Sequence, residues 1–185
     1  MRSLLWVAIM GLCSTPLLAA SPQGFSFAHK DWELACDNTG TCRAAGYGAT
    51  MGEVSVLLTR NAGAAQHVIA VATFAQTERD IPPDATVNLF IDDRDNGPLE
   101  AADESHFRFD DTQTAALIQA LEHNGKIELA LNGERKTLSD AGSSAVFLKM
   151  DEFQQRLGTA DALLRQGDAG DENILSAAPA PEIDR

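Results

Sequence analysis

The residues best suited to bind a polar ligand are Arg60 and a short run that contains Asp151, Gln155 and Arg156. A guanidinium, a carboxylate and an amide together supply charged donors, charged acceptors and a neutral group with both. If the run is helical, Asp151 faces Gln155 and Glu152 faces Arg156, because residues four apart share a helix face. The run predicts a ligand-binding polar patch completed by Arg60 from a strand end. The alternative is a structural attachment of the helix end to the loop that follows.

A second pair of reactive side chains is Cys36 and Cys42. Asn38 and Gly40 lie between them and favour a tight turn that brings the two ends together. A redox motif normally has the closer C-x-x-C spacing, and a zinc site would need two more ligands nearby. A structural disulfide is therefore favoured over a redox-active pair or a metal site. Closing a loop of about seven residues stabilises a fold by roughly 2.4 kcal/mol in the chain-entropy model.

The rest of the sequence offers no complete catalytic, metal or cofactor site. Its four histidines form no metal-binding pattern, and the run from Gly142 to Val146 lacks the final glycine of a nucleophile elbow. An enzyme would need a site assembled from distant side chains, for which the candidates are Asp31, Arg60, Asp151 and Gln155. A non-enzymatic binding domain is the favoured prediction. Another alternative is an inhibitor of a basic cell-wall hydrolase such as lysozyme.

The charge balance restricts the class of partner. The 185 residues contain 14 Lys and Arg against 27 Asp and Glu, which gives a formal net charge of −13. Such an acidic chain has no basic stripe to neutralise nucleic-acid phosphates or to dock on anionic lipid. It suits a cationic protein or peptide, which a negative surface attracts over long range.

Residues 1–20 have the three parts of a secretory signal peptide: a basic Arg2, an apolar stretch from Leu4 to Leu12, and small residues up to Ala20. The apolar stretch is too short to span a bilayer, which needs about 20 such residues. Cleavage near Ala20 leaves an even pair of cysteines, and such pairs oxidise outside the cytoplasm. We therefore expect a periplasmic or secreted protein without a membrane anchor after cleavage.

The elements that must position these residues are mostly strands. Apolar side chains alternate with polar ones in several segments, which is typical of half-buried strands. Clear examples are the set Trp32, Leu34 and Cys36 and the set Ile127, Leu129 and Leu131. Asn132–Gly133 predicts a tight hairpin turn, because both residues accept positive φ angles. The pattern indicates about seven or eight strands in a mostly antiparallel sheet.

Two segments change to helical periodicity. The first begins after Asp110 or Asp111, either of which can cap it, and ends at Asn124–Gly125. The second is predicted to be capped by Ser139 or Asp140, and its apolar stripe consists of Val146, Met150, Phe153 and Leu157. The fold class is therefore a β-rich α+β domain with two helices packed on the sheet. We expect one globular domain over residues 21–168 and a disordered, acidic, Ala/Pro-rich tail over residues 169–185.

Several of these segments resemble the bacterial secreted family catalogued as domain of unknown function 1176. The similar segments are Lys30–Asn38 with Thr41–Ala44, Val54–Arg60, Leu138–Ala145, and Met150–Glu152 with Gln155–Thr159. The resemblance extends from about His29 to Gly167. It implies an exported, disulfide-bearing domain with no established activity, and it transfers no catalytic residue.

Overall fold

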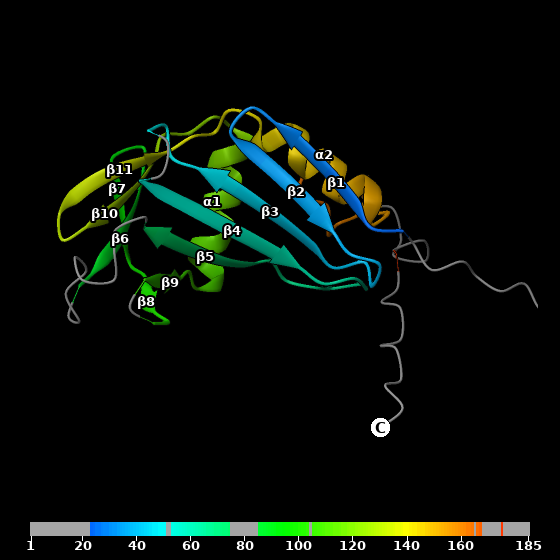
Figure 1. Cartoon of the computed structure of the whole chain (residues 1–185), viewed down its shortest axis with the longest axis horizontal. Helices are drawn as coiled ribbons and strands as arrows, with labels where there is room; N and C mark the ends of the chain where they lie inside the picture. Colours follow the sequence, from blue (N-terminus) through cyan, green and yellow to red (C-terminus); the bar gives the residue numbers. More distant parts are fainter. Residues whose placement is uncertain are drawn as a thin grey trace, which may run out of the picture.

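The computed structural model describes residues 23–50, 53–74, 85–103, 105–164, 166–167 and 175. The predicted signal peptide (residues 1–20) lies outside them, as does the predicted tail (residues 169–185) apart from Leu175. The described residues form eleven strands and two helices (Figure 1). All strand pairs are antiparallel, which confirms the predicted β-rich α+β class.

The larger sheet has seven strands in the order β1-β2-β3-β4-β5-β9-β8. Its strands are β1 (Phe25–His29), β2 (Trp32–Cys36), β3 (Cys42–Tyr47), β4 (Val54–Arg60), β5 (Ile69–Phe74), β8 (Glu100–Ala101) and β9 (His106–Arg108). Alternation decides which side chains are buried: Trp32, Leu34 and Cys36 point inward, while the residues between them are exposed. Figure 1 shows β1 to β5 side by side, with both helices behind them. One face of this sheet therefore stays open in the described structure.

The remaining strands form a second sheet of four, in the order β11-β10-β6-β7. These are β6 (Val87–Ile91), β7 (Arg94–Pro98), β10 (Ile127–Leu131) and β11 (Glu134–Leu138). The predicted hairpin turn joins β10 to β11, with φ of 50° at Asn132 and 87° at Gly133. Among the described residues, an isolated bridge between Gly48 and Leu138 connects the two sheets. Alternation predicted about seven or eight strands, whereas the described residues form eleven, with β1, β3, β7 and β8 unforeseen. The division into two sheets depends on partners that alternation does not encode.

The first helix, α1 (Asp111–Glu122), begins where the sequence predicted. The side chain of Asp110 accepts a hydrogen bond from the Gln113 backbone N–H at 2.7 Å, and the Gln113 side chain accepts one from the Asp110 N–H at 3.0 Å. This reciprocal capping box satisfies donors that the first helical turn would otherwise leave unpaired.

The second helix, α2 (Ser143–Phe153), starts later than predicted, and neither Ser139 nor Asp140 is its N-cap. Gly142 holds that position with a φ of 102°, and a side chain there would overlap the carbonyl of His29. The hydroxyl of Ser139 instead donates to the Asp31 carboxylate at 2.6 Å. The Ser139 oxygen also accepts from the Ala141 N–H at 3.2 Å, so its local hydrogen bond lies ahead of the helix and not in the first helical turn.

The core lies between the helices and both sheets, since its buried residues include Leu89 of β6 and Leu129 of β10 as well as those of the larger sheet. Trp32 is 1% exposed, packs edge to face on Phe147 with 5.5 Å between ring centroids, and donates its indole N–H to the Ser139 carbonyl at 2.7 Å. The ring also fills the space beside Gly46, where any side chain would collide with it. These contacts fix α2 across β1 and β2, and so position its C-terminal end at the end of β4.

Candidate functional site

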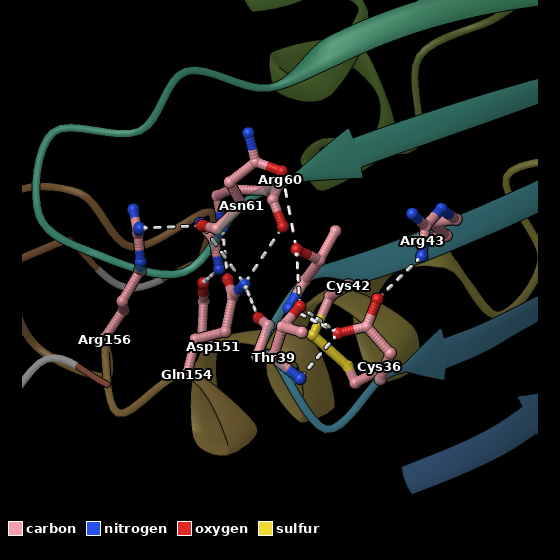
Figure 2. The surroundings of a disulfide bond; sticks show 12 residues. Cys36, Thr39, Cys42, Arg43, Arg60, Asn61, Asp151, Gln154 and Arg156 are labelled. Atoms are coloured by element: carbon pink, nitrogen blue, oxygen red, sulfur yellow. Dashed lines mark hydrogen bonds and ion pairs between the residues drawn. A yellow bond between two sulfur atoms is a disulfide. The ribbon is translucent and has the colours of Figure 1, made fainter. Parts of the chain in front are cut away.

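Four polar side chains meet, fully buried, where β4 and α2 end. We call this set the buried cluster; it consists of Arg60, Asp151, Gln154 and Arg156. Figure 2 shows Arg60 reaching from the strand toward the helix end, with the disulfide beside it. The Arg60 guanidinium donates from Nη2 to Asp151 Oδ1 at 2.6 Å and from Nε to Gln154 Oε1 at 2.6 Å. Its remaining Nη1 donates to the Asp161 carbonyl at 3.1 Å, so each arm of the guanidinium has a partner.

The Asp151 carboxylate is equally saturated. Its second oxygen, Oδ2, accepts from the backbone N–H groups of Leu163 at 2.8 Å and Leu164 at 3.0 Å. Burial lowers the pKa of Arg60 from its usual value, and the adjacent Asp151 charge opposes that shift. Removing water from a charge costs several kcal/mol, and these bonds offset that cost.

Gln154 connects the ion pair to the disulfide loop. Its Nε2 donates to the Gly40 carbonyl at 2.8 Å and to the Arg60 carbonyl at 3.1 Å, while its Oε1 accepts from the Arg60 side chain. Its own backbone carbonyl accepts from the Leu175 N–H at 3.0 Å, and the Leu175 carbonyl accepts from Gly63 at 2.9 Å. Through its side-chain amide and its backbone carbonyl, Gln154 therefore bonds to three segments of the chain.

The disulfide itself is present between Cys36 and Cys42, which are 4% and 0% exposed. The Asp37 side chain organises the loop by accepting from the Thr39 N–H at 2.9 Å and from Arg43 at 3.2 Å. Partial burial raises the pKa of Asp37, but the hydrogen bonds from Thr39 and Arg43 outweigh it and lower the pKa overall. The loop therefore presents the Gly40 carbonyl to Gln154 in a fixed position.

Three of the four residues of the predicted patch lie in the buried cluster, and Gln155 does not. Its side chain is exposed and its backbone has a φ of 58°, because α2 ends at Phe153. The adjacent residue, Gln154, is the amide that sequence reasoning missed. The same early end of the helix makes the predicted pairing of Glu152 with Arg156 wrong. Ligand binding by this patch stays a prediction.

Arg156 turns inward once the helix has ended. Its Nη2 donates to the carbonyl of Asn61 at 3.4 Å and to that of Gly63, and its Nη1 lies 3.7 Å from the Asp161 carboxylate. Leu157, predicted as part of the buried stripe of α2, is instead 45% exposed. Its position just after the helix places it outside the stripe.

The candidates for an enzymatic site do not converge. Arg60 and Asp151 are paired and buried, whereas Asp31 lies at the opposite end of β2 from the disulfide and accepts from Ser139. Within the described ranges, no group of three or more His, Cys, Asp or Glu side chains is placed to hold a metal ion. The helices among these residues are also too short or too polar to cross a membrane.

The open face of the larger sheet offers a different kind of site. A hollow of about 520 Å³ lies over β1 to β4, and its lining includes Ala28, Glu33, Ala35, Arg43, Ala45 and Leu57. Small side chains in adjacent strands create it, since Ala35 pairs with Arg43 and Ala45 pairs with Leu57 across the sheet. Leu57 is 40% exposed and Ile69 is 52% exposed on this face. The hollow is thus a shallow, partly apolar surface that already contains one acidic and one basic side chain.

Together, the two antiparallel sheets, the two helices and the Cys36–Cys42 disulfide define a β-rich α+β domain. The chain belongs to the family described as Protein of unknown function (DUF1176), whose model matches residues 26–185. It is similar to the uncharacterized protein YpfG of Escherichia coli (strain K12), with 30% identity over 187 aligned residues that cover 93% of this chain and 49% of that protein. The chain therefore spans about half the length of this curated relative. No solved structure matches it.

Proposed function

We propose that the protein is exported to the periplasm and acts there as a non-enzymatic binding domain for a cationic protein or peptide. The observation that carries the proposal is the open, partly apolar face of the seven-stranded sheet, where Leu57 and Ile69 are exposed beside the hollow. Exposed apolar groups with a polar surround are typical of protein-binding surfaces. In the buried cluster, by contrast, Arg60 and Asp151 are already saturated by internal bonds, and their side chains are buried rather than on the open face.

Two observations support export. The first 20 residues have the composition of a signal peptide, and Cys36 and Cys42 are joined in the fold. Mass spectrometry of the protein from a periplasmic extract should give a chain that starts near Ser21 and lacks free thiols. An intact leader with two reduced cysteines would overturn this part of the proposal.

The charge supports the choice of partner. Removal of the leader takes away Arg2, so the formal net charge goes from −13 to −14. Attraction between this chain and a basic partner accelerates encounter and weakens as salt increases. A partner found through this surface should therefore contain an excess of Lys and Arg.

The binding test uses the mature chain on a resin, exposed to envelope extract at low and high salt. We expect a basic partner that is retained at low salt and released at high salt. Leu57→Lys should abolish its retention by placing a cation on the open face, whereas Leu157→Lys, at a similarly exposed leucine elsewhere, should not. Equal retention by both variants, or the absence of any salt-sensitive partner, would count against the proposal.

A further inference from the structure

The four sheet edges differ in how they are protected against pairing with another chain. The edge strand β7 contains Arg94, Asp95 and Pro98 and faces a register shift in β6, while β8 has only two residues. Strand β11 contains three consecutive charged residues, from Glu134 to Lys136. Charges, proline, irregular register and short length are the usual ways in which proteins block edge pairing.

Strand β1 has none of these features. Its five residues are Phe-Ser-Phe-Ala-His, without Lys, Arg, Asp, Glu or Pro, and it pairs with β2 in unbroken register. Within the described ranges, no strand lies on its outer side. This edge is therefore regular, uncharged and available to another chain.

The register identifies which backbone groups point outward. The Tyr47 N–H donates to the Asp31 carbonyl at 3.1 Å, so the backbone of Asp31 faces β3 and that of Trp32 faces β1. By alternation, the residues of β1 opposite Trp32, Leu34 and Cys36 direct their backbone groups into the sheet. The N–H and C=O groups of Ser26 and Ala28 then face away from it. Four backbone groups on this edge are placed to receive a strand.

Helix α2 limits what can occupy the edge. Phe153 of α2 stacks on Phe25 of β1 with 5.8 Å between ring centroids, and Figure 1 shows the helix running beside β1 behind the sheet. The edge of β1 is thus exposed, while α2 covers the adjoining sheet face. This arrangement leaves room for one extended chain to pair with β1, but less room for a second complete sheet. On the open face, the small side chains of Ser26 and Ala28 border the hollow and leave room for side chains of an added strand.

We propose that an extended segment of the cationic partner adds to β1 as an eighth strand of the larger sheet. This inference rests on the proposed function and specifies how the partner binds. Affinity comes from main-chain hydrogen bonds to Ser26 and Ala28, and alternate side chains of the segment lie over the hollow. The edge itself carries no charge that could discriminate between partners. The preference for a basic segment comes instead from the net charge of −13 on the whole chain.

The probe is a short capped peptide of alternating lysine and valine, added to the mature, isotope-labelled protein. Amide hydrogen exchange at Ser26 and Ala28 should slow by roughly tenfold when the peptide is bound, because their N–H groups become hydrogen-bonded. A peptide of alternating glutamate and valine should give no protection. A lysine–valine peptide that is N-methylated on the amides facing β1 should also give no protection. It keeps the positive charge but has lost the N–H donors that would bond to the edge.

A protein variant separates strand addition from general attraction. Ala28→Pro removes an outward N–H and leaves intact the bonds that β1 makes to β2, so the fold should persist. Ala28→Pro should no longer bind the lysine–valine peptide, whereas Ala28→Val should still bind it. Near-ultraviolet circular dichroism from buried Trp32, and the absence of free thiols at Cys36 and Cys42, would confirm that both variants are folded.

Each possible result supports or overturns the inference. Lack of peptide binding, or equal binding by Ala28→Pro, would show that no strand is added. If Ala28→Pro still captures a salt-sensitive basic partner from envelope extract, strand addition is wrong and the proposed function survives. If Ser26 and Ala28 become protected without peptide as the protein concentration increases, a second copy of the chain occupies the edge instead.

Discussion

Two groups of ion pairs in this protein differ in their exposure to water and therefore in how much each partner contributes to stability. The buried cluster around Arg60 and Asp151 has no access to water. The second group, which we call the surface ring, covers the smaller sheet and consists of Asp93, Lys126, Glu128 and Arg135. In the ring each cation contacts both anions at 3.0–3.3 Å, yet Asp93 is 70% exposed and Lys126 is 49% exposed.

The difference lies in what happens when one partner is lost. Water can replace a partner in the surface ring, and Arg135 keeps its position over the Phe90 ring at 3.9 Å. No water can replace Asp151, which is 0% exposed. The ring therefore adjusts, whereas the buried cluster requires its complete set of bonds.

The largest predicted effect is that of Asp151→Ala. This substitution leaves the Arg60 guanidinium buried without its counter-ion and should lower the free energy of unfolding by about 3–5 kcal/mol. Urea unfolding followed by circular dichroism measures it. The matched control is Glu152→Ala, which removes an exposed carboxylate paired with Lys149 and should change the stability by less than about 1 kcal/mol.

If Asp151→Ala does not fold, a double variant can still measure the cost of burying an unpaired charge. Arg60→Met with Asp151→Leu removes both charges and retains apolar volume, and such replacements are often tolerated. It should be more stable than either single charge deletion. Equal losses from the single and double variants would indicate that charge burial is not the reason for the sensitivity.

Loss of the disulfide should have the next largest effect. Replacing Cys36 and Cys42 together by alanine should lower the free energy of unfolding by about 2–4 kcal/mol, because the unfolded chain gains freedom. The loop that offers the Gly40 carbonyl to Gln154 also loses its closure. Combining this change with Gln154→Ala should therefore give less than the sum of the two separate losses, which a double-mutant cycle would reveal.

Gln154→Ala alone should destabilise the fold by about 1–3 kcal/mol. It leaves the carbonyl of Gly40 and the Nε of Arg60 buried without their partner. The control is Gln155→Ala, one residue further along, where the amide is exposed. A similar loss in both variants would contradict the assignment of Gln154 to the buried cluster.

Asp93→Asn, in the surface ring, should cost less than about 1 kcal/mol. Its effect should disappear when the salt concentration is raised, because the Debye length shortens to a few ångströms at 1 M. Unfolding at low and high salt would test this. A large loss that persists in high salt would place the ring in the same class as the buried cluster.

The smallest predicted effect is on pH dependence. The pKa of Asp37 is lowered in the folded protein, so its contribution to stability is present above the unfolded pKa and is lost as the pH falls through the folded pKa. The stability difference between the natural chain and Asp37→Asn should therefore shrink on acidification from neutral pH. A difference that grows with acid would have the wrong sign.

Local patterns predicted those elements of this fold whose signals are local, and missed others such as β1 and β3. Alternation identified the buried face of β2, and Asp110 with Gln113 marked the start of α1. The start of α2 could not be predicted in the same way, since its N-cap is Gly142, which makes no side-chain cap bond and fits against the carbonyl of His29 from a distant strand. Pairing between elements was likewise beyond the pattern, which is why one predicted sheet became two.

The buried cluster was only partly predictable for a similar reason. Arg60 and Asp151 stand out as charges next to apolar stretches, and both lie in the cluster. The assignment of Gln155 assumed that α2 continued for another turn, but the helix ends at Phe153 and exchanges the roles of the two glutamines. The predicted helix reaches Leu157 and the observed helix ends at Phe153, so an error of one turn at a helix end replaces a buried side chain by an exposed one.

The position of Trp32 has a practical consequence for spectroscopy. The chain has two tryptophans, and loss of the predicted leader would remove Trp6 and leave Trp32 as the single indole emitter. Because that indole is 1% exposed and bonded to the Ser139 carbonyl, its emission should be blue-shifted in the native state and move to longer wavelength when β2 and α2 separate. Without the predicted leader, the protein would carry an intrinsic fluorescent reporter of the packing between its sheet and its second helix, with no label required.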